Sequence, residues 1–191
     1  MKPVKAKIGQ LRIIGGEWGS RRFNFTEQPG LRPTSDRVRE TLFNWLSGDI
    51  QGSRCLDPFT GSGALTLEAL SRGAAFALAV DLSRDAVAAL REHLTTLNCS
   101  HAEVRQENVI AMLGIPPAEP YNIVFLDPPF HQDLLEPACT ALEANSWLAE
   151  DALIYVESEN SPARLSLPGN WQLHRDKRAG QVWYSLWRRQ A

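Results

Sequence analysis

The sequence predicts an α/β fold with a mainly parallel sheet that helices cover on both faces. From Arg54 onward, short apolar runs of strand length alternate with segments whose apolar residues recur at helical spacing. This alternation is typical of a parallel sheet, because consecutive parallel strands need a crossover that is usually a helix. A chain of 191 residues with 43% hydrophobic content is large enough for one well-buried core. We therefore expect one principal domain.

The region before this alternation is punctuated by glycine and proline. Residues 10–25 alternate short apolar runs with glycines, which indicates a hairpin or two short strands. Prolines and a glycine then break the chain at residues 29–33. Thr34 or Ser35 can cap a following helix, which Gly48 is expected to end. Its apolar residues recur at helical spacing and are Val38, Leu42, Trp45 and Leu46.

The alternating elements of the sheet region follow in order. The predicted strands are Arg54 to Leu56, Ala75 to Val80, Ala102 to Arg105, Ile123 to Leu126 and Leu153 to Glu157. The predicted helices between them are Leu65 to Ser71, Arg84 to Leu97, Val109 to Gly114 and Leu134 to Ala144. The pattern changes at the C-terminus. Trp171 to Arg175 and Val182 to Arg188, joined through Ala179 and Gly180, indicate an antiparallel pair.

The net charge of −2 conceals a division of the chain by sign. Residues 1–40 hold nine basic and four acidic side chains, residues 170–191 hold five and one, and residues 41–169 hold six and seventeen. A polyanion is therefore expected to meet the two ends of the chain. The alternative is that this charge only solvates flexible ends. Aromatic side chains that can stack on bases are interleaved with the arginines, namely Trp18, Phe23, Phe25 and Trp183.

Compartment and redox state follow from what the chain does not contain. No apolar run approaches the ~18 residues of a membrane span, and the lysines of residues 1–10 precede no apolar stretch. We therefore expect a cytoplasmic protein. Cys55, Cys99 and Cys139 are far apart, lack CxxC spacing and lie among apolar neighbours. This pattern predicts reduced, buried thiols and no structural zinc.

A glycine loop follows the first predicted strand of the sheet. Asp57 begins it, and Gly61 and Gly63 allow a tight turn and a close approach to a ligand. A Walker lysine is missing and the spacing is only GxG, which disfavours a phosphate loop. A carboxylate at Asp57 repels a pyrophosphate but suits a cationic amino-acid group, so the loop favours S-adenosylmethionine over NAD. Taken alone, the loop is equally consistent with a plain glycine turn.

The ends of the next two predicted strands strengthen the cofactor interpretation. Asp81 lies about 20 residues beyond the glycines, where an acid can accept hydrogen bonds from both ribose hydroxyls of an adenosine. Asn108 can bind the adenine edge, or it can simply cap a helix. The predicted cofactor-binding residues are Asp57, Phe59, Gly61, Ser62, Gly63, Asp81, Leu82, Asn108 and Val109.

A second loop, Asp127-Pro128-Pro129-Phe130, follows an apolar run of buried-strand type. The first proline restricts Asp127 to extended geometry, and both prolines fix φ. Amino groups on nucleobases are poor nucleophiles, because the nitrogen lone pair is delocalised into the ring. A carboxylate and a backbone carbonyl that accept the amino hydrogens localise this pair and stabilise the developing positive charge. A rigid turn with a solvated Asp is the alternative.

Together the two loops predict in-line methyl transfer from S-adenosylmethionine to an exocyclic amino group of a nucleobase. Asp127, Pro128, Pro129 and Phe130 are the predicted catalytic residues, with the Phe130 ring stacking on the base. Transfer requires a near-linear arrangement of nitrogen, carbon and sulfur, which a stiff loop supports. No metal and no covalent intermediate are required.

These motifs resemble those of class I methyltransferases that act on amino groups. The whole chain resembles the RsmD family, bacterial methyltransferases that act on the 2-amino group of one guanine in 16S ribosomal RNA. The matching segments are residues 12–16, 31–34, 36–40, 57–63, 127–130 and 155–157. The segment RPTSDRVRETLFNWL is the most family-specific of them. Thr60 stands where Ala is common, and Asp81 where Glu is also used, and both changes keep the chemistry.

The resemblance implies a Rossmann-like class I methyltransferase domain over residues 35–191, with a seven-stranded mainly parallel sheet and a C-terminal antiparallel hairpin. It implies a small basic N-terminal β-hairpin over residues 1–34 that helps to grip RNA. The implied partner is 16S ribosomal RNA or the assembling small ribosomal subunit, and the implied state is a monomer.

The resemblance also assigns roles residue by residue. Asp57, Gly61 and Gly63 border the methionine part of the cofactor, Asp81 its ribose and Asn108 its adenine, and residues 127–130 hold the guanine. RNA affinity is expected to depend on arginines near the N-terminus. These are Arg12, Arg21, Arg22, Arg32, Arg37 and Arg39, of which Arg37 or Arg39 can instead pair with Asp36 or Glu40.

Two other functions compete with this one. A DNA adenine methyltransferase uses the same kind of catalytic loop, but such enzymes usually carry a separate target-recognition domain, and this chain shows no large insertion. A nucleic-acid-binding or assembly factor without turnover is the second alternative. The intact Asp127, Gly61 and Gly63 argue against it.

Overall fold

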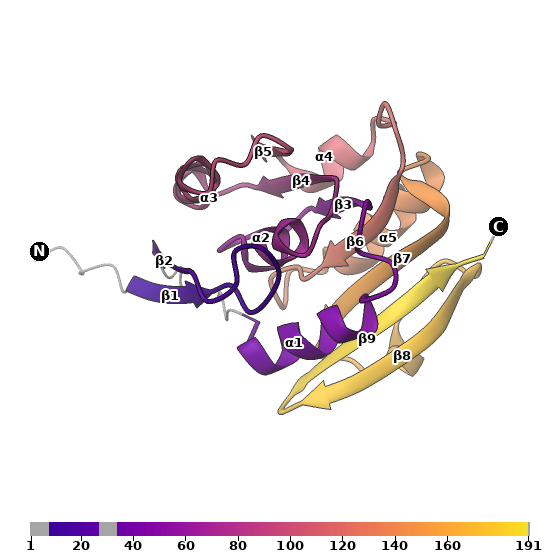
Figure 1. Cartoon of the computed structure of the whole chain (residues 1–191). Helices are drawn as coiled ribbons and strands as arrows, with labels where there is room; N and C mark the ends of the chain where they lie inside the picture. The colour runs from indigo at the N-terminus through magenta and orange to yellow at the C-terminus, as the bar shows by residue number, and fades with distance from the viewer. Residues whose placement is uncertain (1–7, 27–33, 191) are drawn as a thin grey trace, which may run out of the picture.

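The computed structural model describes residues 8–26 and 34–190 (Figure 1). The predicted chain break at residues 29–33 and Arg32 lie outside these ranges. In chain order the elements are β1 (Ile8–Arg12), β2 (Arg22–Thr26), α1 (Asp36–Trp45), β3 (Arg54–Asp57), α2 (Ala64–Ser71), β4 (Phe76–Asp81), α3 (Arg84–Thr96), β5 (Ala102–Gln106), α4 (Val109–Leu113), β6 (Tyr121–Leu126), α5 (Leu135–Ala144), β7 (Leu148–Ser158), the 3-10 helix η1 (Pro162–Arg164), β8 (Trp171–Ala179) and β9 (Val182–Arg189). No helix in this part of the chain is both long and apolar enough to cross a membrane.

The central sheet has seven strands in the order β5-β4-β3-β6-β7-β9-β8. The pairs from β5 to β7 are parallel, whereas β9 runs antiparallel to both β7 and β8. This confirms the predicted α/β class, the mainly parallel sheet and the C-terminal antiparallel hairpin. The strand order reverses between β3 and β6, and in open α/β sheets the crevice for a ligand lies at such a point.

Most element ends lie within one or two residues of the sequence prediction, and the largest differences are at the end of α1, the start of β7 and the end of β8, which runs to Ala179 and not to Arg175. α1 ends at Trp45 and not at Gly48, because the amides of Asp49 and Ile50 both donate to the Leu46 carbonyl and turn the chain early. β7 begins at Leu148, before its predicted start, because a first pairing of Leu148 with Tyr121 precedes a shift in register. The carboxyl ends of β3 and β4 lie one residue beyond the prediction, at Asp57 and Asp81.

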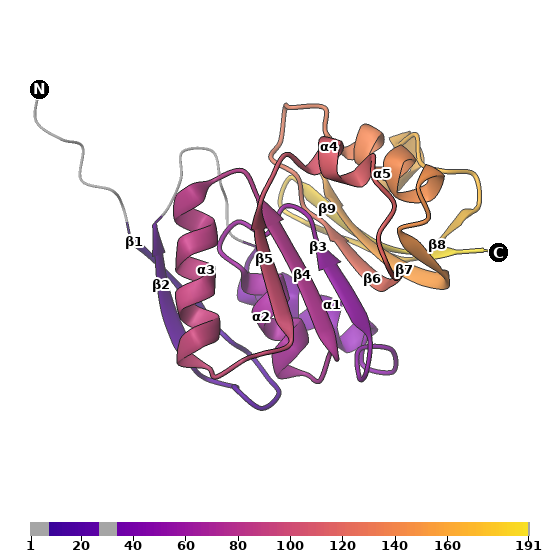
Figure 2. The same ribbon diagram turned by 90° about the horizontal axis from the view of Figure 1, so that it is seen from above.

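Helices cover both faces of the sheet (Figure 2). Side chains of α1, α2 and α3 form one hydrophobic cluster with one face, and those of α4 and α5 form a second cluster with the other. Neighbouring residues of β3 alternate between them, with Cys55 in the first cluster and Leu56 in the second. Cys55 and Cys139 are buried as predicted, but Cys99 is only half-buried, and all three are free thiols.

The N-terminal hairpin is present as predicted, with β1 antiparallel to β2. β2 lies alongside α3, and the connecting loop reaches α2 (Figure 2). The buried Glu68 carboxylate on α2 accepts hydrogen bonds from the backbone amides of Ile14 and Gly15, at 2.7 and 2.9 Å. Gly16 has φ +76°, and a Cβ there would lie 1.9 Å from the Ser71 carbonyl oxygen, so this position requires glycine. The domain boundary at residue 34 stays a prediction.

Candidate active site

Acidic residues gather at one edge of the sheet. Asp57 and Asp81 end β3 and β4, Asp127 follows β6 directly, and Glu157 is the penultimate residue of β7. These strands are parallel, so their carboxyl ends meet at the same edge. The edge therefore brings together Asp57 and Asp127 of the two predicted loops with Asp81. It also contains a fourth acid, Glu157, which was not predicted as a site residue.

Asp57 is buried and is held by two hydroxyl groups. The Thr60 and Thr66 hydroxyls donate to its Oδ2 at 2.9 and 2.7 Å. Burial raises the pKa of Asp57 from 3.8 to about 6, although the bonds from Thr66 and Thr60 oppose that rise, and the nearby Asp81 adds to it. Asp57 is thus ionised at neutral pH with its negative charge fixed in place.

The glycine loop closes over Asp81. Gly61 has φ +49° and its amide donates to Asp81 Oδ2 at 2.9 Å, while the amide of Ser83 donates to Oδ1 at 2.8 Å. Gly63 has φ +80°, and a Cβ there would lie 2.5 Å from Leu90 Cδ1. These contacts orient the Asp81 carboxylate, and a carboxylate keeps further lone pairs with which to accept hydroxyl groups.

The other predicted cofactor residues occupy varied environments. Leu82, directly after Asp81, is 64% exposed, so its apolar side chain lies open to solvent beside the carboxylate predicted to bind ribose. Asn108 caps α4, because its side-chain oxygen accepts from the Ala111 amide at 3.0 Å. Val109 is buried in the core. Phe59 packs partly against the second cluster, and Ser62 is half-buried beside Gly61.

Asp127 belongs to a group of hydrogen-bonded side chains. The Thr34 hydroxyl lies 3.1 Å from Asp127 Oδ2 and 3.0 Å from Glu157 Oε1. The Tyr155 hydroxyl, which is buried two residues before Glu157 on the same strand, donates to the same Oε1 at 2.7 Å. Thr34 precedes α1, so three separate parts of the chain meet here.

Burial dominates the electrostatics of this group. It raises the pKa of Asp127 well above 3.8, and the charge of Glu157 raises it further, against the hydrogen bond from Thr34. Burial also raises the pKa of Glu157, against the bonds from Tyr155 and Thr34. The pKa of Tyr155 is raised by burial and by both carboxylates. The pair therefore holds a proton more tightly than separate exposed acids do.

Two cavities adjoin the catalytic loop. A small one of about 60 Å³ is lined by Asp127 and Glu157 on one side and by Ala179 and Val182 of the C-terminal hairpin on the other. A larger one of about 430 Å³ lies against Pro128 to Pro137 and Glu157 to Asn160. Phe130, the residue predicted to stack on the base, lines both cavities.

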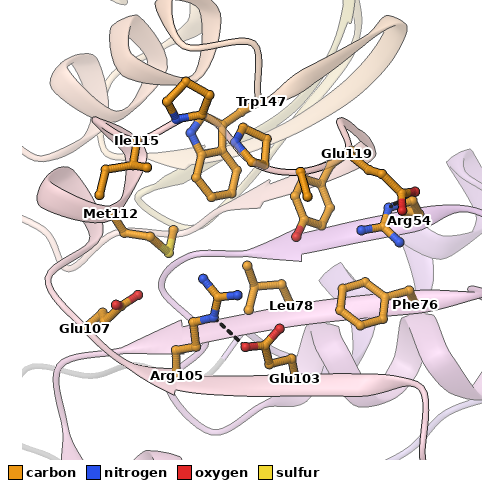
Figure 3. A pocket seen from close by; sticks show the side chains of 14 residues that line it. Arg54, Phe76, Leu78, Glu103, Arg105, Glu107, Met112, Ile115, Glu119 and Trp147 are labelled. Atoms are coloured by element: carbon orange, nitrogen blue, oxygen red, sulfur yellow. Dashed lines mark hydrogen bonds and ion pairs between the residues drawn. The ribbon is translucent and has the colours of Figure 1, made fainter.

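A third cavity, of about 300 Å³, lies elsewhere (Figure 3). It covers β4 and β5 on the α4 face, and the Arg54 guanidinium lies over the rings of Phe76 and Tyr121, at 4.6 and 5.4 Å from their centroids. Arg105 in its lining pairs with Glu103 at 2.7 Å. None of the four carboxylates at the sheet edge lines it, so it is separate from the candidate site.

The sheet edge fits a cationic ligand. The groups that shift the pKa of Asp57, Asp127 and Glu157 are other acids and hydroxyls, and none of them is a basic side chain. Buried acids without a basic partner in the described ranges are suited to a ligand that brings positive charge. S-adenosylmethionine carries a sulfonium and an ammonium group, so the residues present match the predicted cofactor.

The predicted RNA-binding arginines separate into two kinds. Arg12, Arg21, Arg22 and Arg37 are exposed, with Arg12 also paired to Asp36 at 3.3 Å. The prediction that Arg39 binds RNA is wrong, because its side chain is only 2% exposed. Its guanidinium donates to Asp36 at 2.6 Å and to the Arg12 carbonyl at 2.8 Å. It joins the hairpin to α1 and is not available to RNA.

The stacking aromatics separate in the same way. Trp18 and Phe25 lie in the hydrophobic core, so the expectation that they stack on bases is wrong. Phe23 packs against His93 with ring centroids 4.6 Å apart. Trp183 is half-buried, and the Arg178 guanidinium lies 5.7 Å from its ring.

Thr34, Tyr155 and Glu157 belong to the site although the sequence did not predict them there. Tyr155 and Glu157 alternate at the end of a strand that enters the sheet edge, which is the available signal. Thr34 was expected only as a helix cap, whereas Ser35 supplies that bond to Val38. Thr60 and Thr66 were also not predicted as partners of Asp57, and they are found here in that role.

Comparison with known proteins identifies the family to which the chain belongs. The family described as Conserved hypothetical protein 95 matches residues 11–188. Ribosomal RNA small subunit methyltransferase D of Escherichia coli K12 is 51% identical over 190 residues, or 100% of this chain and 96% of that protein. The protein of the same name from Haemophilus influenzae is 45% identical over 94% of each chain. A solved structure, the putative methyltransferase yhhF from Escherichia coli, is 49% identical with a TM-score of 0.88, covering 96% of this chain and 99% of that one. The chain therefore belongs to the RsmD family, as its motifs predicted.

Proposed function

We propose that this protein methylates the exocyclic 2-amino group of a guanine in 16S ribosomal RNA, with S-adenosylmethionine as the methyl donor. The observation that carries the proposal is Asp127, held beside a cavity whose described lining contains acids and no basic side chain. The names of the relatives support ribosomal RNA as the substrate. The choice of guanine depends on the resemblance of the motifs to those of the RsmD family.

The cofactor half of the site comprises the ends of β3, β4 and β5. When bound, S-adenosylmethionine supplies an electrophilic methyl group. Asp57 provides the negative charge for its amino-acid part, and Gly61 and Gly63 allow the backbone to come close. Asp81 accepts the ribose hydroxyls, and the exposed Leu82 packs against the adenine.

The base half of the site comprises the catalytic loop. Asp127 and a backbone carbonyl of the loop accept the two amino hydrogens, which concentrates the lone pair on nitrogen and stabilises its growing positive charge. Phe130 stacks on the base and holds it in line with the methyl group. Pro128 and Pro129 keep the loop stiff, so little reorganisation is needed during transfer.

RNA approaches from the basic ends of the chain. Arg12, Arg21, Arg22 and Arg37 are exposed and bind phosphates, which positions the strand without reading its sequence. The acidic centre of the chain repels RNA elsewhere. Such a substrate places the protein in the cytoplasm, acting on 16S ribosomal RNA or on the assembling small subunit.

The test is a methyl-transfer assay with matched substrates. Small-subunit RNA from a strain that lacks this protein, the same RNA from the parent strain, and duplex DNA are each incubated with labelled cofactor. We expect label only in the first, recovered by mass spectrometry as N2-methylguanosine. Label in duplex DNA as N6-methyladenine would replace the proposal with a DNA adenine methyltransferase, and no label in any substrate would favour an RNA-binding factor without turnover.

A further inference from the structure

Glu157 is a buried carboxylate to which the proposed reaction assigns no role. It follows Val156, which pairs with Leu126 in the parallel β6-β7 ladder, so Glu157 lies beside Asp127 at the carboxyl edge. Both carboxylates line the same small cavity. Burying a second acid next to the first costs free energy, because both desolvation and repulsion disfavour its charged form. The presence of Glu157 therefore suggests a functional role.

One hydroxyl group joins the two carboxylates. Thr34 Oγ1 lies within hydrogen-bonding distance of Asp127 Oδ2 and Glu157 Oε1, at 3.1 and 3.0 Å. A hydroxyl has a single proton to donate and two lone pairs that accept, so it bonds one ionised carboxylate at a time. If one of the acids carries a proton, that proton can be donated to Thr34 while Thr34 donates to the other acid. The geometry thus suits two carboxylates that share a proton.

Among residues 8–26 and 34–190, the groups that line the shared cavity or shift the pKa of the pair supply no positive charge. Asp57 on β3 and Tyr155 on β7 act on the pair electrostatically, and Tyr184 on β9 lies opposite Glu157 in the sheet. α1 and the residue before it contribute only Val38 and Ser35 to the shared cavity. Among the surrounding elements, Lys177 lies one strand further on β8, and His131 pairs with Glu159 at the exposed rim.

The proposed reaction requires a proton acceptor. The amino nitrogen donates its lone pair to the methyl carbon, the carbon–sulfur bond breaks, and that electron pair stays on sulfur. The nitrogen then carries a positive charge and must lose one of its two hydrogens as a proton. Asp127 is the first acceptor within reach, because it already accepts a hydrogen bond from that amino group in the proposed complex.

We propose that Asp127 and Glu157, joined by the Thr34 hydroxyl, form a relay that removes this proton, with Glu157 as its end point. With the cationic cofactor bound, the pair has released the proton that it shares in the free protein, so both carboxylates are ionised before transfer. Asp127 then takes the proton from nitrogen and passes it to Thr34 Oγ1, and Thr34 passes its own proton to Glu157 Oε1, so Asp127 is again a carboxylate. Glu157 also lines the larger cavity of about 430 Å³, from which it can release the proton to solvent. This inference depends on the proposed function, and Glu157 acts through Asp127 as a positioning residue.

Tyr155 supports the assignment of Glu157 as the end point. Its hydroxyl donates to Glu157 Oε1 at 2.7 Å, and burial keeps the tyrosine itself protonated, because its pKa is raised well above 10. Burial raises the pKa of both carboxylates, which agrees with a pair that accepts a proton more readily than exposed acids do. The order of the relay follows from position, since Glu157 and not Asp127 lies between the two cavities.

The first experiment measures single-turnover rates against pH for Glu157→Gln, with Glu159→Gln as the matched control. The glutamine side chain keeps an oxygen for Tyr155 and Thr34 but cannot take a proton. We expect the rate to fall on the order of 100-fold, with cofactor affinity within about twofold and an altered acid limb of the pH profile. Glu159 is 42% exposed at the rim, and its variant is expected to match the original protein. An unchanged rate and pH profile for Glu157→Gln overturns the relay.

The second experiment tests the bridging hydroxyl. Thr34→Val removes the hydroxyl at nearly constant volume, and we expect a rate loss like that of Glu157→Gln together with an acid limb moved to higher pH, because a donor that stabilised the carboxylates is gone. Thr34→Ser restores the hydroxyl and is expected to recover most of the rate. Equal rates for the Val and Ser variants contradict the proposal.

A third measurement separates the relay from the proposed function. Infrared titration of the free protein, without RNA or cofactor, is expected to show a buried carboxyl band that persists to higher pH than that of an exposed acid, and that Glu157→Gln alters and Glu159→Gln leaves in place. If this band is present but no RNA is methylated, the proposed function fails and the proton-sharing pair stands. If RNA is methylated and the band is absent or insensitive to Glu157, the relay fails alone. Circular dichroism of each variant confirms folding.

Discussion

Two groups of buried carboxylates lie at the same edge of the sheet, and they differ in their ratio of hydroxyls to acids. In the cofactor half, Asp57 alone accepts bonds from Thr60 and Thr66. In the base half, Asp127 and Glu157 share the single hydroxyl of Thr34, and only Glu157 has a second donor, Tyr155. Two hydroxyl donors on one carboxylate favour its ionised form. A donor that two carboxylates share stabilises the ionised form of each of them less, so one of the two can carry a proton.

This difference in hydrogen bonding suggests different roles for Asp57 and for the pair of Asp127 and Glu157. Burial raises the pKa of Asp57 only to about 6, because Thr66 and Thr60 oppose the rise, so Asp57 is mostly ionised at neutral pH and suits a cationic ligand. Asp127 and Glu157 hold protons more tightly because burial and mutual repulsion act on both. Their charge can therefore change during a catalytic cycle. In the proposed mechanism, the number of hydroxyl donors, and not burial alone, distinguishes the acid that binds the cofactor from the acids that transfer a proton.

The largest expected effects come from two single variants, each of which removes one acid from one half of the site. Asp127→Ala is expected to reduce methyl transfer on the order of 100-fold or more with near-normal cofactor affinity, because it removes a contact that strengthens in the transition state. Asp57→Ala is expected to weaken cofactor binding first. Single-turnover kinetics and calorimetry measure the two quantities separately. If Asp127→Ala weakens cofactor binding as much as Asp57→Ala does, the two acids do not have the separate roles proposed for them.

The pH dependence of cofactor binding comes next in size. A cation binds the ionised form of Asp57, whose pKa is about 6 in the free protein. Lowering the pH through 6 protonates Asp57, so affinity falls with pH, by about tenfold between pH 7 and pH 5. Calorimetry in buffers of different ionisation enthalpy will show proton release on binding at pH 5. The control is Asp57→Asn, which is expected to bind weakly with little pH dependence.

RNA affinity is expected to depend on residues remote from both acid groups. Arg21→Ala combined with Arg22→Ala should weaken RNA binding several-fold and lower the salt dependence of binding, by about one unit of slope for each phosphate interaction that is removed. Filter binding across salt concentrations gives both values. Arg164→Ala, an exposed arginine on η1, serves as the control. If both variants bind RNA equally weakly, the phosphate interactions are not specific to the hairpin.

The arginines also show which features local sequence patterns can predict. Strands, helices and both loops follow from periodicity, glycine spacing and paired prolines, which act over a few residues. Arg39 looks like its exposed neighbour Arg37, yet it lies inside because Glu68 of α2 and the Arg12 carbonyl of β1 surround it. Trp18 is buried by the same packing.

The acids at the sheet edge likewise separate what local sequence predicts from what depends on contacts between distant residues. Asp127 was predicted as catalytic because its prolines are adjacent in sequence. Thr34 and Glu157 are 123 residues apart, and no local pattern joins them. The ends of parallel strands could be placed at one edge from the sequence, but the hydroxyls that set the charge of each acid come from helices and loops elsewhere. Their partners therefore required the three-dimensional structure.

The smallest expected effect sharpens the comparison most directly, because it changes the number of hydroxyls on Asp57. Thr66→Val removes the donor that lowers the pKa of Asp57 most, so that pKa is expected to rise above its value of about 6. Cofactor affinity then falls by about twofold at pH 7 and by more at pH 6, since a larger fraction of Asp57 is protonated. Thr60→Val, which removes the weaker of the two hydroxyl contributions, is the matched variant and should shift the profile less. Calorimetric affinities measured across this pH range distinguish the two. If neither variant moves the profile, the hydroxyls do not set the charge of Asp57, and the distinction between a fixed and an exchangeable carboxylate must come from burial alone.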